Sequence, residues 1–164
     1  MKKLIQSVIF LILTVVIFAF SSCAQGVKKL SFVEVNGQKI SCRMDMAEVL
    51  DAFKDEDYEY SESISCAYNG LDKIYDFTNL GFVVYTYPDG DKDFVLEVSV
   101  YSDEISQQGD KVKVSMSLED LEALYGKDYT KEGDALTYTV KDEQTMSFLV
   151  VDGKVEEYTI SVAE

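Results

Sequence analysis

The chain has 164 residues, of which 47% are hydrophobic, and its 30 Asp and Glu outnumber its 15 Lys and Arg to give a formal charge of −15. Nucleic acid is therefore excluded as a partner, because binding it requires Lys and Arg to neutralise phosphates. The chain also contains no His, so it lacks the commonest general base and metal ligand. We expect no enzyme activity, no catalytic residues, no cofactor and no metal.

The first 22 residues have the pattern of a secretory signal peptide. Lys2 and Lys3 precede an apolar stretch that ends at Phe20, and two serines then lead to Cys23. A basic start, an apolar middle and a small-residue end are typical of an exported protein, and a cysteine at that end resembles the lipobox of bacterial lipoproteins. We expect residues 1–22 to be removed, Cys23 to be lipidated, and residues 23–30 to form a tether. The alternatives are a plain signal peptide or an uncleaved anchor helix.

The next predicted elements lead into a first unit, residues 31–104. Short strands are expected at 31–35 and 38–42, followed by a helix that Asp45 caps and Glu48 supports as in a capping box. Three strands follow at 73–77, 82–87 and 94–101, with a turn at 88–91 between the last two. Asp89, Asp91 and Asp93 alternate as in an EF-hand loop, but the later ligand positions are wrong, so we interpret them as a solvated hairpin tip.

A second unit, residues 105–164, repeats this order. A strand at 111–114 precedes a helix that Ser117 caps and Gly126 ends, and three strands follow at 136–140, 145–151 and 154–162. The helices and turns of the two units match in position, which predicts a tandem duplicate. The expected class is α+β: each unit is a short helix plus an antiparallel meander, with the helices on one face of the sheet and the other face open.

Two cysteines remain in the mature chain, Cys42 and Cys66. An even pair in a small exported domain favours a disulfide. Two free thiols are the alternative.

Alternation predicts which side chains face water. Glu97 and Tyr101 fall on the polar side of strand 94–101, with Val95 among them, opposite Phe94, Leu96, Val98 and Val100. The face of strand 82–87 is left open by alternation, so Tyr85 and Tyr87 belong either to the core or to the open face. Exposed tyrosine beside polar residues is typical of an interface. We therefore predict partner binding by Tyr85, Tyr87, Glu97 and Tyr101.

Some motifs resemble a known superfamily. The capped helix that runs into Gly126-Lys127-Asp128-Tyr129, and the meander that ends in Asp152-Gly153-Lys154-Val155, are similar to the unit of β-lactamase-inhibitor-protein-like proteins, which include SmpA-type envelope lipoproteins. Residues 65–73, 85–93 and 125–129 look more closely like uncharacterised lipoproteins of Gram-positive anaerobes. The resemblance implies protein binding through an open sheet face.

Together these patterns predict a lipoprotein on the extracytoplasmic face of the cell membrane. Its membrane contact is expected through the lipid anchor alone, and its partner is expected to be an envelope or secreted protein. The alternative is a structural envelope component with no specific soluble ligand.

Overall fold

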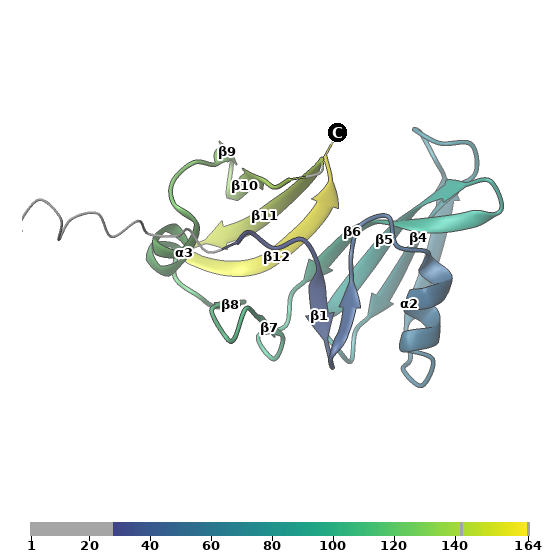
Figure 1. Cartoon of the computed structure of the whole chain (residues 1–164), viewed down its shortest axis with the longest axis horizontal. Coiled ribbons are helices and arrows are strands. Elements are labelled where there is room, and N and C mark those ends of the chain that lie inside the picture. Colours follow the sequence, from purple (N-terminus) through teal and green to yellow (C-terminus); the bar gives the residue numbers. More distant parts are fainter. Residues whose placement is uncertain (1–27, 142, 164) are drawn as a thin grey trace, which may run out of the picture.

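The computed structural model describes residues 28–141 and 143–163. It is 50% strand and 11% helix, and its main feature is one antiparallel sheet of eight strands in the order β3-β4-β5-β6-β12-β11-β10-β9 (Figure 1). The strands of this sheet are β3 (Glu59–Ile64), β4 (Leu71–Phe77), β5 (Phe82–Asp89), β6 (Lys92–Val100), β9 (Thr130–Glu132), β10 (Ala135–Thr139), β11 (Gln144–Val151) and β12 (Lys154–Val162).

Two small hairpins and two short helices complete the described structure. The hairpins pair β1 (Val33–Val35) with β2 (Gln38–Ile40), and β7 (Ser106–Gln107) with β8 (Val112–Lys113). The helices are α2 (Met46–Ala52) and α3 (Leu118–Tyr125).

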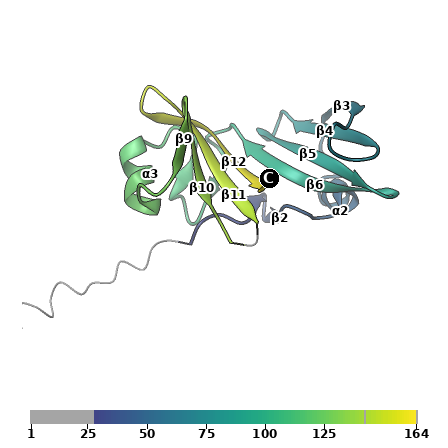
Figure 2. The same ribbon diagram turned by 90° about the horizontal axis from the view of Figure 1, so that it is seen from above.

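The sheet consists of two meanders joined side by side. Strands β3 to β6 form one and β9 to β12 form the other, and β6 pairs with β12 where they meet (Figure 2). We call this β6–β12 junction the seam. Across it Ser99 lies opposite Thr159 and Glu97 lies opposite Ser161.

The predicted helix caps are confirmed. The Asp45 carboxylate accepts a hydrogen bond from the Ala47 amide at 3.0 Å, and the Ser117 hydroxyl accepts one from the Asp120 amide at 3.1 Å. Each cap satisfies an amide that has no partner within its helix. Gly126 ends α3 with φ at 81°, a conformation that glycine adopts without strain.

The core lies on one face of the sheet. Large side chains of that face, such as Phe77, Phe82 and Tyr158, are fully buried. Their cover comes from the hairpins as well as from the helices: Val33 and Ile40 of the first hairpin belong to the same hydrophobic cluster.

The expected α+β tandem duplicate is wrong. The described part of the chain is mostly β, with a single eight-stranded sheet and two helices, which span seven and eight residues. Helices this short cannot cover a sheet of eight strands, so hairpins and loops complete the core. The sequence reading missed β3 because all six of its residues are exposed and it has no apolar alternation.

The expected signal peptide and the lipidated Cys23 lie outside the described residues. Within the part that is described, no helix is long and apolar enough to span a membrane.

A β-bulge changes the predicted face of one strand. The register between β5 and β6 shifts after Tyr85, which lies opposite Glu97, so that Thr86 lies opposite Val95. Leu96 is the extra residue, and Val95 instead of Leu96 is fully buried. The prediction therefore holds for Val98 and Val100, and is wrong for the residues before the bulge.

Candidate functional site

The face of the sheet opposite the core is lined by hydroxyl, carboxylate and tyrosine side chains. These residues alternate along their strands with the buried residues of the core, so they point away from it. We call this surface the polar face, and its members are Asp72, Ile74, Asp76, Val83, Tyr85, Tyr87, Glu97, Ser99, Tyr101, Thr137, Thr145, Ser147, Glu157, Thr159 and Ser161.

Hydroxyl side chains form cross-strand pairs on the polar face. The Ser99 and Thr159 oxygens are 2.7 Å apart across the seam, and the Thr145 and Ser161 oxygens are also 2.7 Å apart. Cross-strand hydrogen bonds of this kind stabilise neighbouring strands and fix the rotamers of the side chains that make them. The surface around the seam is therefore an ordered array of donors and acceptors.

Two carboxylates flank the hydroxyl pair at the seam. The Ser99 oxygen is 3.5 Å from Glu97 Oε1, and the Thr159 oxygen is 3.4 Å from Glu157 Oε1. The three contacts are Glu97–Ser99, Ser99–Thr159 and Thr159–Glu157, and each needs one donated proton. The two hydroxyl groups together supply only two. A third proton, held by one of the carboxyl groups, would fill all three.

Glu97 is the carboxyl best placed to hold that proton. Burial raises the pKa of Glu97, the negative charge of Glu157 raises it further, and the hydrogen bond from Ser99 opposes the shift. Desolvation and a like charge both disfavour the ionised form of an acid. Glu97 directly follows the bulge in β6, and from this residue onward the strand alternates with Glu97 on the polar face.

Tyrosine side chains lie beside this acidic centre. Tyr85 is directly opposite both Ile74 and Glu97 in the sheet. Burial raises its pKa, and the charges of Glu97 and Glu157 raise it further. Tyr101 is 38% exposed and donates a hydrogen bond of 2.6 Å to Asp76 Oδ1; burial and this bond raise its pKa to about 12. Both phenols are therefore neutral hydrogen-bonding groups at neutral pH.

The structure brings Tyr85, Glu97 and Tyr101 together on the polar face, which settles the face of β5 that alternation left open. Tyr87 points to the same side but lies towards the far end of β5, where its ring stacks on Tyr68 with the centroids 4.8 Å apart. Tyr68 from the β3–β4 loop thus covers part of the Tyr87 ring.

The expected disulfide between Cys42 and Cys66 is wrong. Both cysteines are free, because Cys42 is buried in the core just before α2 whereas Cys66 is exposed in the β3–β4 loop. Burial raises the pKa of the Cys42 thiol to about 12.

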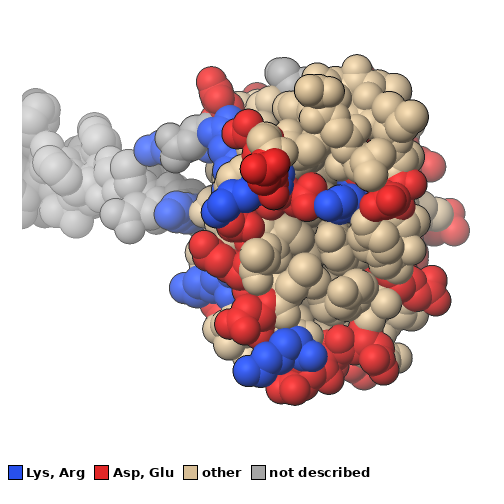
Figure 3. Space-filling view, turned by 90° about the vertical axis from the view of Figure 1, so that its right-hand side faces the viewer, with Lys and Arg blue, Asp and Glu red and all other residues tan. Residues whose placement is uncertain are grey.

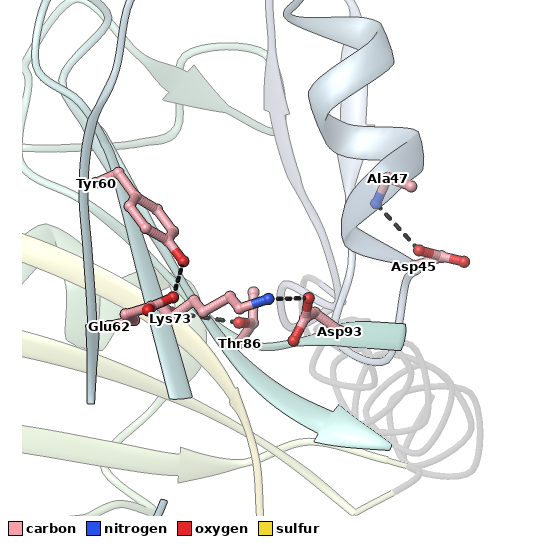
Figure 4. Close-up of polar contacts among 7 residues, drawn as sticks. All are labelled: Asp45, Ala47, Tyr60, Glu62, Lys73, Thr86 and Asp93. Atoms are coloured by element: carbon pink, nitrogen blue, oxygen red, sulfur yellow. Dashed lines mark hydrogen bonds and ion pairs between the residues drawn. The ribbon is translucent and has the colours of Figure 1, made fainter. Parts of the chain in front are cut away.

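Asp93 of the β5–β6 hairpin is engaged in an ion pair on the core side of the sheet. Asp93 is 2.7 Å from the Lys73 ammonium (Figure 4). Lys92, at the hairpin tip, is 2.5 Å from Asp45 at the start of α2. Within residues 28–141 and 143–163, no three or more Asp, Glu or Cys side chains form a group that could hold a metal ion.

Charged side chains ring the end of the molecule that carries α2. Figure 3 shows more acidic than basic side chains there, many of them towards the border, with uncharged surface between them. This distribution agrees with the formal charge of −15 for the whole chain.

Sequence reasoning missed some members of the site. Thr159 and Glu157 were missed, because nothing local in the sequence indicates that β12 pairs with β6, which places them beside Ser99 and Glu97. Asp76 was missed because the sequence does not indicate that Tyr101, 25 residues away, donates a hydrogen bond to it. The signal that did indicate this part of the polar face was the presence of tyrosines near an acidic residue.

Comparison with known proteins gives no neighbour for this chain. No protein-family model matches it, and neither a curated protein nor a solved structure matches it.

Proposed function

We propose that the protein is a membrane-anchored extracytoplasmic lipoprotein that binds another protein through the polar face of its sheet, without enzymatic chemistry. The observation that carries this proposal is the set of Tyr85, Tyr101 and Glu97 around the Ser99–Thr159 hydroxyl pair. Tyrosine gives a large contact area at a low cost in side-chain entropy.

The acidic charge supports a protein partner with a complementary surface. Asp76, Glu97 and Glu157 share the polar face, and none of the residues that define this face is Lys or Arg. Electrostatic complementarity of this kind increases association rates and excludes wrong partners. A basic surface on an exported or envelope protein fits these requirements.

Site-specific photo-cross-linking in the native cells tests the binding surface. A photoreactive amino acid at Thr159, on the polar face, should give one discrete cross-linked protein. The same group at Glu48, which is exposed on α2, serves as the control and should give none. Equal products at both positions, or no product at either, would overturn the binding proposal, and the second result favours a structural envelope component.

The anchor is tested separately. Metabolic labelling with a fatty acid should mark the full chain, and a Cys23→Ser variant should carry no label. Equal labelling of the variant would exclude Cys23 as the lipidated residue without affecting the cross-linking result.

A further inference from the structure

A hollow of about 330 Å³ opens on the polar face beside Tyr85, between β3, β4 and β5. Its apolar lining is Ile74, Tyr85 and Leu96, and its polar lining includes Ser61, Ser63 and Asp72. The bulge supplies Leu96 as an extra residue on one side, whereas the small serines of β3 leave space on the other.

Asp72, which lines this hollow, has one carboxylate oxygen without a partner. Asp72 Oδ1 is buried, and no hydrogen-bond donor reaches it in the described part of the chain. A buried acceptor that has lost its water without gaining a donor is destabilising, so native structures rarely leave one unsatisfied.

The neighbouring lysine does not supply that donor. Lys73 follows Asp72 in β4 and so points to the opposite face, where its ammonium lies 2.7 Å from Asp93 (Figure 4). Thr86 Oγ1 also bonds to the Lys73 carbonyl on that side, at 3.3 Å. The positive charge nearest in sequence is thus already paired elsewhere.

The hollow therefore combines an apolar floor with a carboxylate, that of Asp72, whose hydrogen-bonding capacity is not filled. This combination matches a long side chain that has an aliphatic stem and a cationic end, since Lys and Arg bury their methylene groups along apolar surface while the charged end finds a partner. The other carboxylates of the polar face, such as Glu97, add negative potential around it.

We propose that this hollow receives a lysine or arginine side chain of the bound protein. The stem lies on Ile74, Tyr85 and Leu96, and the cationic group donates to Asp72. This inference rests on the proposed function, because it names the chemistry by which the partner engages the same face.

Nuclear magnetic resonance of the full chain in detergent tests the hollow directly. The probe is N-acetyl-arginine amide, and the readout is the methyl resonance of Ile74. We expect a saturable shift, and no shift with the uncharged N-acetyl-norleucine amide at the same concentrations. Asp72→Asn should weaken probe binding about tenfold, because a hydrogen bond to a charged group is lost.

Asp103→Asn is the matched control, because Asp103 is an exposed acid outside the sheet and its loss of charge should leave probe binding unchanged. A shift that never saturates, or equal binding by Asp72→Asn and the parent, would overturn the inference. Because Asn has nearly the same shape as Asp, the amide spectrum of the variant verifies that the fold is retained.

The two proposals fail separately. If the Thr159 cross-link to a protein forms but the arginine probe does not bind, the hollow inference alone is overturned. If the probe saturates and no cross-link forms, the cation site stands as a property of the hollow and the protein-binding function falls.

Discussion

The hydroxyl oxygens of Ser99 and Thr159 lie 2.7 Å apart across the seam that joins the two meanders. Ser99 is only 2% exposed, so little water can replace Thr159 as its partner. This pair therefore links the two halves of the sheet by a side-chain contact in addition to the backbone ladder.

A double-mutant cycle measures that link. Ser99→Ala and Thr159→Val should each lower the free energy of unfolding by about 1 kcal/mol, because each substitution leaves the remaining hydroxyl of the pair without its partner. The double variant should lose less than the sum, with a coupling of about 0.5–1 kcal/mol. Urea unfolding gives all the values. Thr137→Val combined with Ser99→Ala is the control and should be additive, since Thr137 bonds to Ser147 instead; an additive Ser99–Thr159 cycle would show that the contact adds no stability.

Glu97 makes stability depend on pH. Its pKa is raised in the folded state, so the folded protein binds more protons than the unfolded chain between the ordinary and the raised pKa. Stability should therefore fall as pH rises through that interval and level off above it. Glu97→Gln should remove this fall. Compared with the parent, the variant should therefore gain stability as the pH is raised from acidic to neutral.

Thermal unfolding of Glu97→Gln and the parent across acidic and neutral pH checks this expectation. Glu156→Gln is the matched control, because Glu156 is exposed on the same kind of bulged strand. If the difference between parent and Glu97→Gln stays constant with pH, Glu97 is not the group responsible.

Gly81 in the turn between β4 and β5 should tolerate no side chain. Its φ is +78°, and a Cβ there would lie 2.1 Å from the Cβ of Ser102. Gly81→Ala should lower the free energy of unfolding by about 3 kcal/mol, from backbone strain and the steric clash together. Gly133→Ala is the control: its φ is +59° but nothing lies within 4 Å of the added Cβ, so it should cost only about 1 kcal/mol. Equal losses would mean that the contact with Ser102 relaxes freely.

The two free cysteines should react very differently. Cys66 is exposed, whereas Cys42 is buried and its pKa is raised to about 12; only the thiolate reacts with alkylating agents. Of these two cysteines, iodoacetamide should therefore modify only Cys66 in the folded protein and both in urea, as read by peptide mass spectrometry. Protection of both residues in urea without reductant would instead reveal a disulfide.

Local sequence rules predicted the ends of elements well. Asp45, Ser117 and Gly126 act at the helix ends as expected, because a cap depends on residues two or three positions away. Strand β12 was predicted with its observed bounds, since its apolar and polar residues alternate over most of its length.

Relationships between distant strands could not be predicted in the same way. The bulge that buries Val95 instead of Leu96 depends on the register with β5, and the meeting of Glu97 with Glu157 depends on the seam. The fold class was wrong for a related reason: the fully exposed strand β3 is held in the sheet by pairing with β4, and the sequence of β3 alone does not indicate this pairing.

The seam also has a consequence for how the molecule assembles. Strand β6 pairs with β12, from which it is separated in the chain by residues 101–153. Until β12 arrives, the edge of β6 that bears Val98 and Val100 has unpaired amides and carbonyls, which is the kind of edge that invites aggregation. Closing so long an intervening segment is entropically costly and slow. We therefore expect docking of β12 to limit the folding rate, and the half-formed sheet to be the species most in need of a chaperone.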